Sequence, residues 1–169
     1  RINRFLNREG VSKRTSELKV YEAVLHYHYW LTNLSLENGV KAENALSHAI
    51  DLDPSYALPY ALLSDVYAVN YQWGRELSPA FLDKSQLLAI KSLDLDAECQ
   101  YAQWSMAFNY FLRGDGEQFQ LFAKEALRIN PYNTNVIVGV GLKTCMIGNW
   151  EEGLALIDKG SRLNLCLPG

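Results

Sequence analysis

A chain of 169 residues suits one ordinary domain or one short array of repeats, and its 49% hydrophobic content is too high for a disordered chain. No apolar run approaches the ~20 residues that cross a bilayer, and no signal-peptide pattern opens the sequence. The net charge of −3 divides into +4 over residues 1–19 and −7 over the remainder, and this acidic body argues against nucleic acid as the main partner.

The basic start is interpreted as a linker or N-terminal extension over residues 1–14, because basic runs are usually solvated. A nucleic-acid or membrane contact is the alternative for this segment. The sequence opens at Arg1 and stops at Gly169, which indicates a piece of a longer chain. The three cysteines are far apart and form no Cys-x-x-Cys pair, so we expect buried thiols in a reducing, cytoplasmic compartment.

Helix signals dominate the first half of the chain. A first helix is expected from Thr15 or Ser16 to about Leu34, followed by a break at Glu37-Asn38-Gly39. The next helices are expected at about 40–52, ended by a proline, and from about residue 55 to a long loop at 71–78. A fourth helix then begins at Pro79, a favourable first position, and runs to about Leu95.

The second half continues the same plan with four more helices. They are expected at about 98–113, from the Gly114-Asp115-Gly116 turn to Asn130, at about 134–147 with Gly148 as the stop, and at about 150–163. The last helix carries an apolar end at Leu163, Leu165, Cys166 and Leu167. We therefore expect further repeats, another domain or a second copy to cover it.

Similar phrases close the even-numbered helices at Pro54, Ala97, Pro131 and Leu165, at intervals of 43, 34 and 34 residues. Small residues keep the same phase, with separations of 12 and 7 between Gly141, Gly153 and Gly160. Two helices approach closely only where the side chains at their crossing are small. The pattern therefore predicts stacked helix pairs, with an insertion of nine residues in the loop at 71–78.

The 34-residue spacing and the run AIDLDPSYALPYALLSDVYA at residues 49–68 resemble the tetratricopeptide-repeat (TPR) family. More loosely, they resemble the TPR regions of bacterial adenylate-cyclase-like and winged-helix regulatory proteins. The resemblance implies an all-α, right-handed solenoid of about four repeats and eight antiparallel helices over residues 15–169, with repeats at about 15–54, 55–97, 98–131 and 132–165. Trp30 and Phe119 depart from it, because small residues are expected there.

The candidate site is the concave stripe that the odd-numbered helices of such an array share. An exposed aromatic patch on the fifth helix is expected to anchor a partner, and one face of a helix accounts for its spacing. If the phase is wrong by one residue, Trp104 instead packs in the core. The predicted partner-binding residues are Asp65, Tyr101, Trp104, Ser105, Phe108, Leu112, Asn135 and Leu142.

No catalytic, cofactor or metal site is predicted. The sequence holds no phosphate-binding glycine loop and no zinc-protease motif. His26 and His28 are two residues apart and do not share a helical face. Paired aspartates such as Asp51 and Asp53 recur at repeat ends, which indicates turn chemistry.

These features predict a non-catalytic module that binds a protein or peptide in its groove. The alternative is a regulatory or dimerising tail of a larger bacterial signalling protein, with a homodimer formed through the C-terminal helix.

Overall fold

The computed structural model describes residues 18–165, with side chains described to residue 163, and this part of the chain contains helices and no strand. The first helix is described over 18–32. The others are α2 (Leu36–Leu52), α3 (Ala57–Gln72), α4 (Pro79–Leu95), α5 (Gln100–Leu112), α6 (Gly116–Ile129), α7 (Thr134–Met146) and α8 (Trp150–Leu165). The expected linker at 1–14, the helix start at Thr15 or Ser16, and Cys166 and Leu167 lie outside the described residues.

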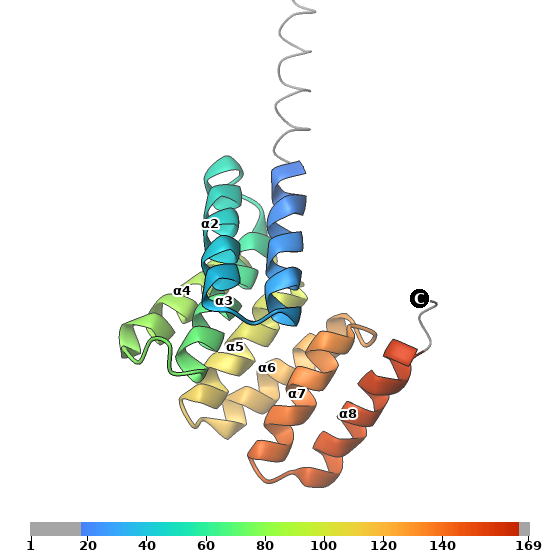
Figure 1. Cartoon of the computed structure of the whole chain (residues 1–169). Helices are drawn as coiled ribbons and strands as arrows, with labels where there is room; N and C mark the ends of the chain where they lie inside the picture. Colours follow the sequence, from blue (N-terminus) through green and yellow to red (C-terminus); the bar gives the residue numbers. More distant parts are fainter. Residues whose placement is uncertain (1–17, 166–169) are drawn as a thin grey trace, which may run out of the picture.

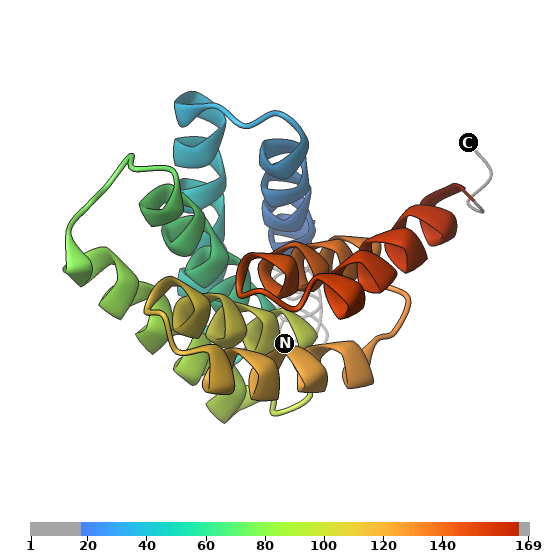
Figure 2. The ribbon, with the colours of Figure 1, turned by 90° about the horizontal axis from the view of Figure 1, so that it is seen from below.

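Successive helices form antiparallel pairs that follow one another along an arc (Figures 1 and 2). The first helix packs on α2 and α3, and α3–α4, α5–α6 and α7–α8 make the most extensive contacts within pairs. Helix α3 is buried around most of its circumference, as a central helix must be, and it also contacts α5 of the next pair. The predicted all-α solenoid is confirmed.

The second helix begins earlier than predicted. The expected break at Glu37-Asn38-Gly39 is wrong, because these residues lie in the first turns of α2. Ser35 caps the helix: its hydroxyl oxygen accepts a hydrogen bond from the backbone N–H of Asn38 at 3.1 Å. Gly39 lies inside the helix, where it contacts an indole: a Cβ there would be 3.2 Å from Nε1 of Trp30. The large Trp30, unexpected in the repeat pattern, is thus accommodated by a glycine across the interface.

Other helix ends follow the local chemistry that the sequence predicts. Pro79 occupies the first turn of α4, where its missing N–H costs nothing. Gly148, with a φ of 99°, follows α7 in the left-handed region that favours glycine. The loop between α3 and α4 is shorter than expected, at 73–78, because α3 continues through Gln72.

The close crossings lie where the small residues predict them. A Cβ on Gly141 would lie 2.8 Å from the carbonyl oxygen of Gly153, so the α7 and α8 backbones are in contact. At the equivalent α3–α4 crossing, Ser64 Oγ donates to the Ser85 carbonyl and Ser85 Oγ donates to the Ser64 carbonyl, both at 2.7 Å. Glycine and serine therefore serve the same geometric need in different pairs.

Candidate functional site

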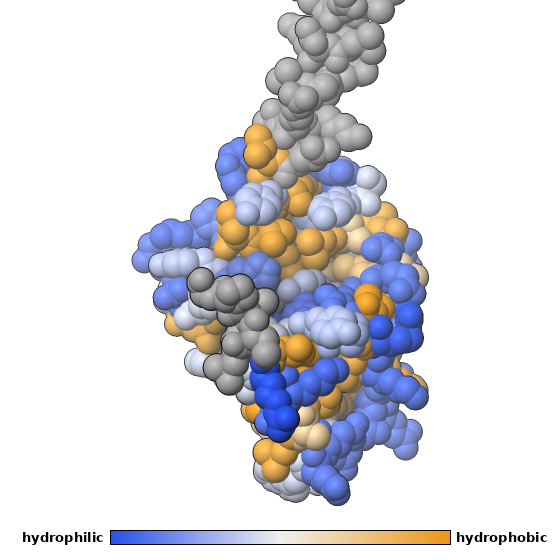
Figure 3. All heavy atoms as spheres, turned by 90° about the vertical axis from the view of Figure 1, so that its right-hand side faces the viewer, coloured by the Kyte–Doolittle hydropathy of each residue, from blue (hydrophilic) through white to orange (hydrophobic). Residues whose placement is uncertain are grey.

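A groove of about 590 Å³ runs across the odd-numbered helices. Side chains from the first helix, α3, α5 and α7 line it, together with Gly160 and Ser161 of α8. Figure 3 views the side of the molecule on which the first helix and α8 lie, and hydrophobic side chains gather there among hydrophilic ones. The groove thus joins segments that are far apart in the sequence, as a concave face of stacked pairs does.

Asp65 of α3 is the polar centre of the groove floor. Its carboxylate accepts a hydrogen bond from the Tyr27 hydroxyl at 2.9 Å and another from Trp104 Nε1 at 2.8 Å. These two bonds connect the first helix, α3 and α5 through one buried side chain. Burial raises the pKa of Asp65, whereas the two hydrogen bonds and the positive charge of Lys143 act in the opposite direction.

Lys143 of α7 supplies positive charge to the same groove. Its Nζ lies 4.6 Å from the centre of the Phe108 ring, a distance suited to a cation–π contact. Burial lowers the pKa of Lys143, and the charge of Asp65 partly offsets this effect. The charged residues among those that line the groove are therefore Asp65 and Lys143, which are of opposite sign.

Stacked aromatic rings of α5 form part of the groove floor. The rings of Trp104 and Phe108 stack with centroids 5.4 Å apart. Gly139 lies against the indole so closely that a Cβ there would be 2.9 Å from Trp104 Cη2. This packing fixes the position of both rings at the groove floor.

The structure brings together six of the eight predicted site residues. Asp65, Tyr101, Trp104, Phe108, Asn135 and Leu142 line the groove. Ser105 does not: it is buried, and its hydroxyl donates to the Ala61 carbonyl at 3.1 Å. Leu112 packs instead against the core cluster that α5 forms with α3, α6 and α7.

The expected exposure of the aromatic patch is wrong. Trp104 is only 8% exposed and Phe108 only 1%, because they stack on each other and Trp104 is bonded to Asp65. They present ring surface at the groove floor without projecting from it. The exposed side chains of the groove include Leu142 and Asn135 on α7, and Trp73 beyond the end of α3.

Several groove residues were missed in the sequence. Tyr27 and Leu31 line the groove and lie 34 residues before Ala61 and Asp65. They therefore occupy the same repeat positions as Trp104 and Phe108, and the 34-residue spacing was the signal that could have found them. The unexpected size of Trp30 obscured this register. Trp73 lies in the inserted loop, where the repeat pattern gives no phase, and it carries no such signal.

Comparisons with known proteins support the fold. No protein-family model matches the chain, and no curated protein does. The solved structure of TTC0263, a thermophilic TPR protein of Thermus thermophilus, is similar with a TM-score of 0.68 at 16% identity, over 98% of this chain and 90% of that one. A crystal structure of MamA is similar with a TM-score of 0.51 at 14% identity, over 91% and 85% of the two chains.

At sequence identities this low, the structural similarity shows the fold alone: the chain has the helical-repeat architecture of a TPR protein. Within residues 18–165, no group of three or more histidine, cysteine, aspartate or glutamate side chains is placed to hold a metal ion. The described helices include none with the length and apolar character of a membrane span.

Proposed function

We propose that this protein is a non-catalytic interaction module that binds a peptide or a partner domain in the groove. The groove itself carries the proposal: four helices from different repeats converge on one hollow with an aromatic floor. Its lining is mostly apolar with a few polar groups, which suits recognition of a polypeptide. Protein rather than nucleic acid is the expected partner, because the body of the chain is acidic.

The rim and the floor have different roles in this proposal. Trp73 and Leu142 are 57% and 47% exposed and offer apolar surface that a partner can bury. Asn135 adds an exposed amide on α7, about two turns before Leu142, that can bond to a peptide backbone. The floor residues Trp104 and Phe108 are already packed, so they shape the groove more than they project into it.

Selection of binding peptides from a displayed library tests the proposal. The selected peptide is then titrated, by fluorescence anisotropy, into the parent chain and into Leu142→Glu, which places a charge on the exposed rim. The matched control is Leu87→Glu on α4, which is also exposed and does not line the groove. We expect at least tenfold weaker binding for Leu142→Glu and no weakening for the control. Equal affinity for all three chains would exclude the groove.

A second candidate function is a regulatory or dimerising tail of a larger bacterial signalling protein of the adenylate-cyclase-like or winged-helix type. Trp150 and Leu154 support it, because they leave two large apolar side chains exposed on the last helix. In this form the homodimer contact is on α8, in a cytoplasmic protein. Sedimentation of Leu154→Lys tests this second candidate: it requires a parent dimer that becomes monomeric in the variant, and a dimer that Leu154→Lys leaves unchanged would contradict it.

A further inference from the structure

The first helix has two apolar stripes on opposite sides. Val20, Ala23, Tyr27 and Trp30 face inward and join the core with α2 and α3. Opposite them is an outer stripe that consists of Leu18, Tyr21, Leu25 and Tyr29. These four side chains are 49–62% exposed, and their spacing places them on one face of the helix. A contiguous apolar stripe of this kind on a surface marks a contact with another macromolecule.

The spacing of the outer stripe allows it to pair with the same stripe of a second copy. If two first helices lie antiparallel with Leu25 at the two-fold axis, Tyr21 of one copy lies opposite Tyr29 of the other. The same register places Leu18 opposite Thr32, which is exposed at the end of the helix. Each tyrosine contact therefore occurs twice, as an interface between identical surfaces requires.

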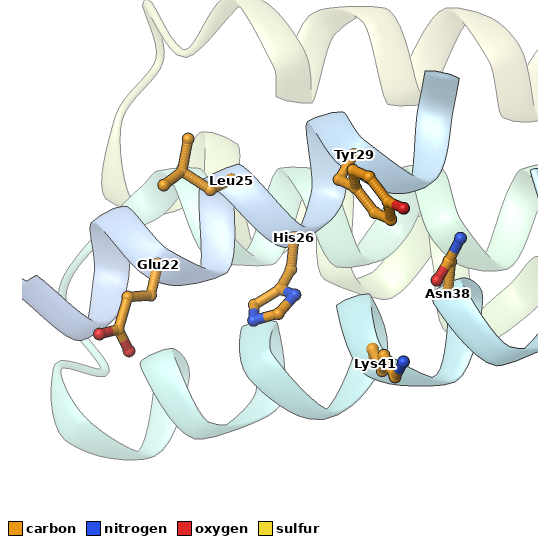
Figure 4. A pocket seen from close by; sticks show the side chains of 6 residues that line it. All are labelled: Glu22, Leu25, His26, Tyr29, Asn38 and Lys41. Carbon is orange, nitrogen blue, oxygen red and sulfur yellow. The ribbon is translucent and has the colours of Figure 1, made fainter. Parts of the chain in front are cut away.

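The charges beside the stripe favour the same arrangement. Glu22 and His26 project from the same side of the first helix and line a shallow hollow next to α2 (Figure 4). A two-fold axis perpendicular to the helices places the Glu22 and His26 side of both copies on the same side of the interface. Glu22, which pairs with Lys19 of its own chain, then lies near His26 of the other copy. The nearby lysines are already paired within the chain, Lys19 with Glu22 and Lys41 with Glu37. The flank therefore carries no large charge of one sign that would keep two copies apart.

We infer that the outer stripe of the first helix is a homotypic interface, in which two copies of this chain pair antiparallel about Leu25. The inference concerns the opposite end of the array from α8 and does not depend on what the groove binds. It leaves the groove open, because the groove uses the inner side of the first helix, at Tyr27 and Leu31.

Sedimentation equilibrium of the full chain tests the interface. We expect the parent to dimerise, and Leu25→Lys to raise the dissociation constant at least tenfold, because a charge at the centre of an apolar contact is costly. Leu87→Lys on α4 and Leu154→Lys on α8 are exposed controls that should leave the dimer unchanged. A monomeric parent, or dissociation caused by Leu154→Lys and not by Leu25→Lys, would overturn the inference. Circular dichroism establishes that the variants are folded.

Cross-linking tests the orientation. In a Cys166→Ser background, Leu25→Cys should form a disulfide-linked dimer under mild oxidation, since the two thiols meet at the axis. Tyr21→Cys and Tyr29→Cys should cross-link efficiently only when the two variants are mixed. Cross-linking of Tyr21→Cys with itself at the level of the mixture would indicate parallel helices and contradict the arrangement. A Leu25→Cys yield no greater than that of Leu87→Cys would contradict the interface.

Discussion

The α3–α4 and α7–α8 pairs cross at equivalent positions of the repeat, but different residues make the two crossings. Ser64 and Ser85 exchange two hydrogen bonds with each other's carbonyls, and Asn109 of α5 donates to Ser85 Oγ at 2.9 Å. In α7–α8, Gly141 and Gly153 bring the backbones into direct contact. The first crossing has room for a small side chain, whereas the second has none.

The same contrast extends to the contacts between pairs. Buried polar side chains connect the earlier part of the array, with Asp65 at the junction of the first helix, α3 and α5. Helix α7 contacts α5 and α6 less extensively than α5 contacts α3 and α4. Among the described helices, α8 packs mainly on α7. Buried serine and aspartate side chains therefore stabilise the earlier junctions, whereas the α7–α8 crossing depends on glycines that carry no side chain. The two regions should respond to opposite kinds of substitution.

Asp65→Ala should have the largest effect. It removes the acceptor of the Tyr27 hydroxyl and the Trp104 indole, and we expect the free energy of unfolding to fall by about 3 kcal/mol. Asp65→Asn keeps one oxygen acceptor and should cost less than about 1.5 kcal/mol. Urea unfolding followed by tryptophan fluorescence measures both. Equal losses for the two variants would show that the hydrogen bonds do not stabilise this junction.

Gly153→Ala should cost about 2 kcal/mol, with its effect concentrated in α7 and α8. A Cβ there would lie 2.7 Å from both the Cys145 backbone nitrogen and the Gly141 carbonyl oxygen, so the backbones must separate. Amide hydrogen exchange should become faster in α7 and α8 and stay unchanged in α3 and α4. The control is Gly116→Ala, which meets no heavy atom within 4 Å. A loss spread evenly along the array would contradict the local effect.

Ser85→Ala places the same residue at the equivalent position of the α3–α4 crossing. The methyl group fits where the serine Cβ already is, and the loss of the hydrogen bonds should cost about 1 kcal/mol. The comparison of the two alanine variants by urea unfolding isolates the difference between the crossings. A larger loss for Ser85→Ala than for Gly153→Ala would reverse our interpretation.

The pH dependence of stability should show the smallest effect. Because burial raises the pKa of Asp65 above its ordinary value of 3.8, the native chain binds this proton more tightly than the unfolded chain does. The contribution is complete below pH 3.8 and is lost as the pH rises through the raised pKa. Asp65→Asn should remove this decline from the stability profile. If the free energy of unfolding changes with pH above 3.8 in the same way for the parent and for Asp65→Asn, the pKa of Asp65 is not raised.

Much of the fold follows from local signals in the sequence. Both ends of α4 lie where they were predicted, because Pro79 fixes the first turn and the repeat phrase fixes the end at Leu95. The spacing of the small residues located the crossings, since only backbone contact or very short side chains allow them. The start of α2 was missed although its cap, Ser35, is a local signal, because Gly39 was interpreted as a helix break. The contact of Gly39 with the ring of Trp30 from another helix explains why a glycine lies inside α2.

The position of the groove was predictable from the sequence, but the exposure of the side chains that line it was not. The repeat phase placed Trp104 and Phe108 on the concave face, and they line the groove. Their burial depends on Asp65, which is 39 residues before Trp104, and on the close approach of Gly139. Such contacts between repeats leave no periodic trace in the sequence, so periodicity cannot separate an exposed ring from a buried one.

The indole N–H signals of the four tryptophans offer the most direct test of the groove. Trp104 and Trp73 line it, whereas Trp30 is buried against Gly39 and Trp150 lies at the start of α8 outside it. In a ¹⁵N spectrum recorded with a peptide selected for binding, we expect shifts of the Trp73 and Trp104 signals and little change in the other two. Shifts confined to Trp30 or Trp150 would contradict it.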